Sequence, residues 1–280
     1  MYFADCVLRS VTRLPWGQGY KDENFLFREH LDIVSEGLVF YNGVSAPKRC
    51  IHERATTMEM YKKEACSTDV KDDPDARELL RRAFERTARW PADFKGFTAD
   101  LTVNVNGKEF KGSVAVKSAQ EVSVSLADAE LQKWAAGTIG MIAVHRGPRT
   151  FDQSDGKSVL TLERGTVHPM GQTIHIHDNL QSHYRVKEDR ITQINRTMGP
   201  IKFTINVEDS ALTQDNKYLT TRYTVYYFNA QSGALTNVES FTDSHVRLGQ
   251  ADLPASRRII SAENGMVSVK TLTFLNHHLL

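Results

Sequence analysis

A strict alternation of apolar and polar residues in the middle of the chain constrains its fold more than any other feature. From Phe97 to Val105 every second residue is apolar, which is the period of a β-strand with one buried face. Asn106-Gly107 follows, the dipeptide most typical of a two-residue type I′ hairpin turn. The alternation then returns as far as Val116. We therefore expect an antiparallel hairpin over residues 97–116.

Further strands are predicted along the rest of the chain, separated by turn residues such as Asp155-Gly156 and Ser232-Gly233. They cover residues 122–126, 158–163, 171–177, 184–187, 190–196, 201–207, 218–228, 235–243, 257–262 and 266–275. A continuous run of strands, with helices only early in the chain, favours an α+β protein with one long antiparallel sheet. Such a sheet curls, so we expect a half-barrel with one or two helices packed across it.

Two segments have the period of a helix. Residues 75–89 keep one apolar face and end before Trp90-Pro91, where the proline disfavours further helical turns. Residues 127–144 carry a second apolar stripe, which Gly137 and Gly140 are expected to weaken or break.

The chain changes character near Asp72-Asp73-Pro74. Before this point no period of 2 or 3.6 residues is sustained. We therefore predict two parts, an N-terminal extension over residues 1–72 and an antiparallel sheet domain over residues 73–280.

Composition excludes several classes of protein. Lys and Arg number 35 and Asp and Glu number 34, for a net charge of +1, so no overall field would hold a nucleic acid. No run approaches the roughly 18 consecutive apolar residues of a membrane-spanning helix. The chain has no Gly-rich phosphate loop, Gly-x-Ser-x-Gly elbow or His-Glu-x-x-His motif, which argues against common nucleotide enzymes, α/β-hydrolases and zinc proteases.

The cysteines and the N-terminus indicate a compartment. Cys6, Cys50 and Cys66 have no paired spacing, which is typical of a reducing environment. Asp5 and Arg9 interrupt any apolar stretch at the N-terminus, so it does not have the form of a secretory signal. We expect a cytoplasmic protein.

Several motifs in residues 75–280 resemble those of a known family. They are Ala76–Glu85, Trp90, Phe94–Asp100, Val144–Arg146, Phe151, Tyr184–Val186, Arg196, Met198-Gly199, Leu219–Tyr223, Phe241–Asp243 and Phe274–Leu280. In these stretches the chain resembles an uncharacterised domain-of-unknown-function family of cyanobacterial, plant and other bacterial proteins. The resemblance supports the domain boundary and the fold, and it transfers no catalytic residue because the family has no established activity.

A looser resemblance concerns a helix followed by the strand Phe97–Val103 and a strand containing Lys111–Val114. This arrangement is similar to the half-open barrels of lipoprotein carriers and related periplasmic sensors. The similarity implies a concave face that binds acyl chains. The absence of a secretory signal argues against lipoprotein transport itself.

Histidines provide one candidate site. His175 and His177 share one face of a predicted strand, and His183 follows just beyond it. Two imidazoles on a strand and a third from its neighbour would suit zinc, copper or iron. If Ile174 and Ile176 face the core instead, the histidines face water on an ordinary amphipathic strand. His145 and His245 are candidate general bases beside Asp243 or Glu239.

Aromatic and basic residues provide a second candidate site, for a ligand. Its residues are Trp134, Tyr184, Arg196, Arg222 and Tyr223. An arginine at the mouth of an aromatic cavity would pair with a carboxylate head group. The alternative is an arginine lying over an aromatic ring at the sheet surface.

Three functions follow. The leading hypothesis is a non-enzymatic binding protein that holds an apolar or amphipathic small molecule in the concave face of the sheet. The alternatives are a metal-assisted or general-base enzyme that uses the histidines, with a transition metal as its cofactor, and an interaction scaffold. The sequence names no other cofactor and leaves an oligomer open.

Overall fold

The computed structural model describes residues 70–280. The predicted N-terminal extension over residues 1–72 therefore lies almost wholly outside the described residues, and the domain boundary stays a prediction. Within residues 70–280, no helix is both long enough and apolar enough to cross a membrane.

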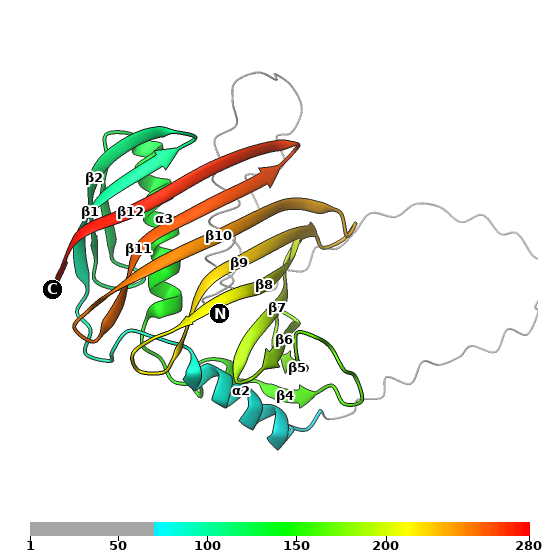
Figure 1. Cartoon of the computed structure of the whole chain (residues 1–280). Helices are drawn as coiled ribbons and strands as arrows, with labels where there is room; N and C mark the ends of the chain where they lie inside the picture. Colours follow the sequence, from blue (N-terminus) through cyan, green and yellow to red (C-terminus); the bar gives the residue numbers. More distant parts are fainter. Residues whose placement is uncertain (1–69) are drawn as a thin grey trace, which may run out of the picture. The chain divides into compact units, whose positions relative to one another are not determined.

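The described residues form two α-helices, one 3₁₀ turn and twelve strands (Figure 1). The helices are α2 (Pro74–Arg86) and α3 (Ala129–Arg146), and the 3₁₀ turn is η1 (Asp155–Lys157). The strands are β1 (Phe97–Val105), β2 (Lys108–Val116), β3 (Val122–Ser125), β4 (Val159–Leu162), β5 (Gln172–His177), β6 (Ser182–Lys187), β7 (Arg190–Met198), β8 (Ile201–Leu212), β9 (Tyr218–Asn229), β10 (Leu235–Leu248), β11 (Ala251–Glu263) and β12 (Met266–Leu279).

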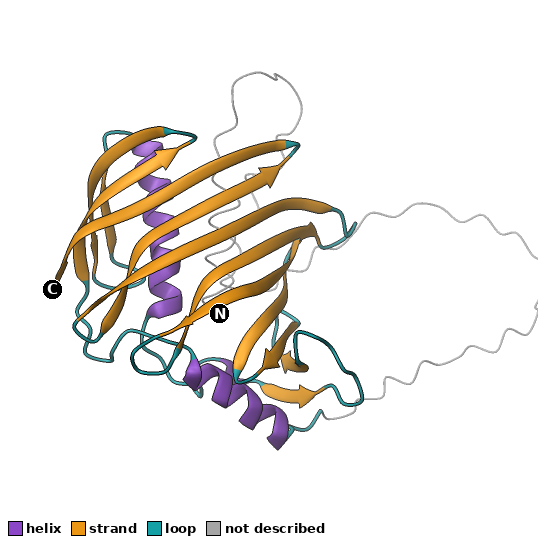
Figure 2. Ribbon diagram, viewed as in Figure 1, coloured by secondary structure: helices purple, strands orange, loops and turns teal. Residues whose placement is uncertain are grey.

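All twelve strands belong to one antiparallel sheet, in the order β3-β2-β1-β12-β11-β10-β9-β8-β7-β6-β5-β4. The sheet curls and stays open between β3 and β4 (Figure 2). The predicted α+β class, with a curled antiparallel sheet and two helices, is confirmed. At the predicted hairpin, Asn106 and Gly107 have φ of 49° and 95°, positive at both positions as a type I′ turn requires.

The two helices pack on separate clusters of buried residues, and we call the sheet surface that carries these clusters the inner face. Helix α3 covers one end of it, in a cluster that includes Phe97, Leu101, Val103, Ala135, Ile139, Ala143, Leu253, Leu272 and Phe274. Helix α2 covers the other end, in a cluster that includes Ala76, Leu80, Ala83, Phe84, Leu160, Ile174, Ile176 and Tyr184. A third cluster, with Met198, Phe203, Ile205, Val225 and Tyr227, lies on the strands between.

The ends of α2 differ slightly from the expected 75–89. Asp73 caps its first turn by accepting a hydrogen bond from the Asp75 N–H at 2.9 Å, and Pro74 follows at the first helical position. The helix ends at Arg86 because the next residues join the sheet. Ala88 N–H donates to the Tyr218 carbonyl of β9 at 2.8 Å.

Helix α3 is unbroken, although Gly137 and Gly140 were expected to weaken or break it. The Asp128 carboxylate caps its first turn through the Leu131 N–H at 2.9 Å. Ala135, Ile139 and Ala143 are then buried on the inner face. Tertiary packing of this face outweighs the low helix propensity of two glycines.

Strand β11 begins six residues earlier than expected. The predicted strand started at Arg257, whereas β11 starts at Ala251. In the structure Pro254 pairs with His245 at a β-bulge, where the register shifts between Ser244 and His245. The bulge accommodates the missing backbone donor of the proline.

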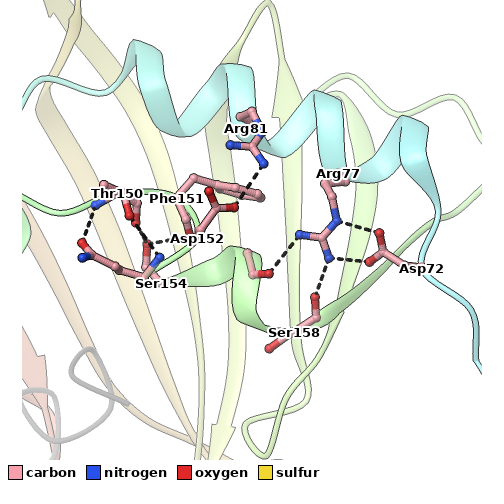
Figure 3. Close-up of polar contacts among 10 residues, drawn as sticks. Asp72, Arg77, Arg81, Thr150, Phe151, Asp152, Ser154 and Ser158 are labelled. Atoms are coloured by element: carbon pink, nitrogen blue, oxygen red, sulfur yellow. Dashed lines mark hydrogen bonds and ion pairs between the residues drawn. The ribbon is translucent and has the colours of Figure 1, made fainter.

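The free edge of β4 is covered by the residues that enter α2. Leu160 N–H donates to the Asp72 carboxylate at 2.9 Å, and Asp73 N–H donates to the Leu160 carbonyl at 2.8 Å. Arg77 holds Asp72 through two bonds of 2.6 Å and also donates to the Ser158 carbonyl (Figure 3). Covering an edge in this way blocks pairing with another chain.

Two connections cross between the ends of the sheet. Residues 87–96 lead from α2, beside β4 to β6, to β1 near the opposite end. Residues 147–158 lead back from α3 to β4. The first connection meets the start of the second at the end of α3, where Trp90 N–H donates to the carbonyl of Arg146, the last residue of that helix, at 2.7 Å.

Replacing Leu80 by alanine should lower the free energy of unfolding by about 3 kcal/mol, because a fully buried side chain of α2 would leave a cavity against the sheet. Urea denaturation of the full chain measures this change. Glu78→Ala, at an exposed position of the same helix, is the control and should change stability by less than about 0.5 kcal/mol. An equal loss in both variants would show that α2 does not pack as described.

Candidate functional site

A groove with a volume of about 940 Å³ lies where the two connections meet. Its walls come from the C-terminal half of α2, residues 87–91, residues 149–152 and the turns β8–β9 and β10–β11. This volume lies within the range of roughly 300–1,000 Å³ that is usual for small-molecule sites. The groove is therefore large enough for a ligand.

The groove has more basic than acidic side chains. The basic ones are Arg81, Arg89, Arg149, Lys217 and Arg247, and the acidic ones are Glu85, Asp152 and Asp215. Two of the arginines are already paired. Arg81 lies 3.1 Å from Asp152 (Figure 3), and Arg247 lies 2.8 Å from Asp215 and 2.9 Å from Asp252.

Arg89 and Arg149 have no carboxylate at ion-pair distance within residues 70–280. Arg89 Nη1 donates to the carbonyls of Phe84 (2.7 Å) and Thr87 (3.2 Å), at the end of α2. Arg149 Nη1 donates to the Val144 carbonyl at 2.8 Å, at the end of α3. Each guanidinium is thus held by the negative end of a helix dipole.

The same two guanidinium groups lie on one aromatic ring. Their central carbons are 3.7 Å (Arg89) and 5.9 Å (Arg149) from the centre of the Phe84 ring. Arg89 Nε is buried and has no hydrogen-bond acceptor among the described residues. Burial, followed by the charge of Arg149, lowers the pKa of Arg89 to about 9. A desolvated cation with an unused donor favours binding of an anion.

A second polar layer lies behind the groove. Arg196 donates to the Ser182 hydroxyl at 3.0 Å and to the Tyr184 hydroxyl, and its Nη2 lies 3.8 Å from Asp155. Burial raises the pKa of Asp155, opposed by the charges of Arg196, Arg149 and Arg89. The pKa of Tyr184 is also raised, because burial disfavours the phenolate. The charge of Asp155 in turn raises the pKa of both Arg89 and Arg149, against the effect of burial.

The five ligand-binding residues predicted from sequence do not lie together. Tyr184 and Arg196 are in contact behind the groove. Tyr223 lies further along the inner face, stacked on Phe241 with ring centres 4.5 Å apart. The other two are elsewhere: Arg222 is exposed and lies 3.2 Å from Glu208, and Trp134 of α3 lies under Lys270 at 4.7 Å.

The predicted metal site receives no support from the described residues, which contain no group of three His, Cys, Asp or Glu side chains suited to a metal. Ile174 and Ile176 are buried, so His175 and His177 point away from the core. His175 pairs with His183 across β5 and β6, with ring centres 5.9 Å apart. His177 instead bonds to the Thr161 hydroxyl at 2.9 Å. His177 is therefore turned towards β4, while His175 and His183 face each other across β5 and β6.

The candidate general bases are buried and weakly basic. Burial, reinforced by Arg257 and Arg149, lowers the pKa of His145 to about 3. Burial, reinforced by Arg146, lowers the pKa of His245 to about 4. The expected partner Asp243 is instead bound to Arg257 through bonds of 2.9 and 2.6 Å.

Glu239, the other expected partner of these histidines, accepts a hydrogen bond from the Tyr227 hydroxyl at 3.0 Å. Burial raises the pKa of Glu239. Its hydrogen-bond partner is therefore a tyrosine of the neighbouring strand.

Sequence reasoning missed Arg89, Arg149 and Asp155. Arg89 appeared as one of several arginines on the polar face of a helix, and Asp155 appeared as a turn residue. Arg149 stood in an unassigned loop. The local signals were the proline after Trp90 and the turn at Asp155-Gly156, which mark the two connections without showing that they meet.

Together these features define a class of protein, an open antiparallel sheet whose crossing connections form a basic groove. A family model extends the assignment to sequence. The chain belongs to the family described as "Protein of unknown function (DUF3386)", whose model matches residues 71–280. None of the curated proteins matches the chain.

Two solved structures are similar at low identity. One is a putative outer membrane lipoprotein-sorting protein domain from Vibrio parahaemolyticus, with 7% identity, a TM-score of 0.28, and coverage of 73% of this chain and 92% of that one. The other is the MucA/MucB complex of Pseudomonas aeruginosa, with 9% identity, a TM-score of 0.18, and coverage of 73% and 99%. At these TM-scores, neither similarity bears on what this chain binds.

Acid should destabilise the fold partly through His145. In the unfolded chain a histidine takes up a proton below its ordinary pKa of 6.5, whereas folded His145 does so only near 3. Stability is therefore lost as the pH falls below about 6.5, by about 2 kcal/mol at pH 5 for this group. Urea denaturation at pH 7 and pH 5 should show a smaller loss for His145→Gln than for the wild type.

The exposed His278 supplies the control for this measurement, because His278→Gln should keep the wild-type loss between pH 7 and pH 5. Other buried groups titrate in the same range, so the comparison rests on the difference between variant and wild type. An unchanged loss in His145→Gln would contradict a neutral, buried imidazole.

Proposed function

We propose that this chain is a non-enzymatic binding protein, and that the groove holds the anionic end of a small amphipathic molecule. One observation carries the proposal: the guanidinium groups of Arg89 and Arg149 both lie against the Phe84 ring in the groove, and their hydrogen-bond partners among the described residues are backbone carbonyls. Unpaired, partly desolvated guanidinium groups at a cavity are suited to a carboxylate or a phosphate.

Aromatic rings beneath the cations support the amphipathic part of the proposal. Phe84 and Phe151 pack edge to face, with ring centres 5.7 Å apart. Arg81 lies over the Phe151 ring at 4.6 Å. Both rings are buried, so a ligand that displaces water from this surface would contact the apolar stems of the arginines that cover them as well as the charges.

The non-enzymatic part of the proposal rests on the candidate catalytic groups. His145 and His245 have pKa values of about 3 and about 4, far below the neutral range in which a general base works best. Their expected carboxylate partner Asp243 is bound to Arg257.

Binding can be tested with octanoate and with octyl glucoside, which has the same tail and no charge. We expect octanoate to raise the thermal unfolding midpoint of the full chain and octyl glucoside to leave it unchanged, because the charge is recognised. Arg89→Gln and Arg149→Gln should each weaken octanoate binding about tenfold or more in calorimetric titration.

Arg82→Gln is the matched control for this experiment, since Arg82 lies on the same helix, is paired with Asp189 and does not line the groove. It should bind octanoate within about twofold of the wild type. Equal responses to octanoate and octyl glucoside, or an equal loss in all three variants, would contradict the proposal. Circular dichroism spectra confirm that each variant is folded.

A further inference from the structure

We infer that the ligand's anionic group is a phosphate monoester, bound in its doubly charged form by Arg89, Arg149 and Lys217. This inference rests on the proposed function and narrows it from anions in general to one chemical class.

The number of unpaired cations is the first argument. Besides Arg89 and Arg149, the groove contains Lys217, whose Nζ donates to the Glu85 carbonyl at 2.7 Å and has no ion-pair partner in residues 70–280. Three cations thus face the groove without a carboxylate of their own. A phosphate monoester has three terminal oxygens to meet them, whereas a carboxylate has two.

Charge balance is the second argument. Within the groove five basic side chains face three acidic ones. This count leaves an excess of two formal positive charges in the groove, which matches the charge of about −1.5 to −2 on a phosphate monoester at neutral pH. A carboxylate would compensate only half of it.

Donor geometry is the third argument. Among the described residues, the hydrogen bonds of both guanidinium groups are made by Nη1 to helix carbonyls, so we expect Nη2 to be the donor that meets a ligand. Guanidinium forks match the tetrahedral oxygens of phosphate through paired bonds. The helix carbonyls hold the forks in place before the ligand arrives, which limits the entropy lost on binding.

Octyl phosphate and octyl sulfate distinguish charge from shape, since both head groups are tetrahedral and only the phosphate becomes a dianion. Calorimetric titration of the full chain at pH 8, below micelle-forming concentrations, should show octyl phosphate binding about tenfold tighter than octyl sulfate. At pH 5.5 only about a quarter of the phosphate is dianionic, so its affinity should fall about fourfold.

The carboxylates that face the ligand are Glu85, Asp152 and Asp215 in the groove and Asp155 behind it. Octyl sulfate keeps its single charge at both pH values, so any change in its affinity reports on these groups and is subtracted. Lys217→Gln should weaken octyl phosphate binding several-fold more than it weakens octyl sulfate binding, because the lost charge acts on a dianion more strongly than on a monoanion. Arg82→Gln, outside the groove, should keep the preference.

Equal binding of octyl phosphate, octyl sulfate and octanoate at pH 8 would overturn the phosphate assignment and leave the proposed function standing. Failure of all three to bind would overturn both. Glycerol 3-phosphate identifies the source of the group: binding as tight as that of octyl phosphate supports a soluble phosphate ester, and markedly weaker binding supports a lipid phosphate. Both results agree with a bound phosphate dianion. The comparison of octyl phosphate with octyl sulfate is the measurement that tests the dianion itself.

Discussion

Two chain crossings between the ends of the sheet create the groove. Helix α2 precedes β1 in sequence but packs beside β4 to β6, so residues 87–96 must travel towards the other end, and residues 147–158 must return. The bond from Trp90 N–H to the Arg146 carbonyl joins these segments, and the Trp90 indole donates to the Asp252 carbonyl of β11 at 3.0 Å. Arg89 and Arg149 lie beside this junction, one on each connection. Their proximity is thus a consequence of topology.

The junction is also where both helices end, which explains how the fold tolerates the buried cations. Helix C-terminal carbonyls carry a partial negative charge of about half a unit per helix, and Arg89 and Arg149 each bond to such carbonyls. This contribution offsets part of the cost of desolvating the two guanidinium groups. The charge of Asp155 offsets a further part. If the two arginines only capped the ends of α2 and α3, one N–H donor from each guanidinium group would be enough. Capping leaves the excess of positive charge in the groove unexplained, and an anion would compensate it.

Local patterns predicted the elements, and non-local contacts decided the site. The alternation over residues 97–105 and the Asn106-Gly107 turn determine a hairpin within twenty residues, so period and turn chemistry suffice. The face of β5 could not be decided in the same way, because His175 and Ile174 alternate and either set suits a buried face. Pairing with β4 and β6 settles it. Arg89 and Arg149 are sixty residues apart, with three strands and a helix between them, and no local period indicates that they meet.

Stability and binding share the same residue in this arrangement. Phe84 belongs to the buried cluster that holds α2 against β4 to β6, and its ring also supports both unpaired guanidinium groups. An anion bound between residues 87–91 and 149–152 would join the two connections, and through them the ends of α2 and α3. Because such a ligand binds only when both helices are in place, its binding free energy adds to the free energy that holds them on the sheet. The groove is therefore a point at which a ligand would strengthen the crossing that forms it.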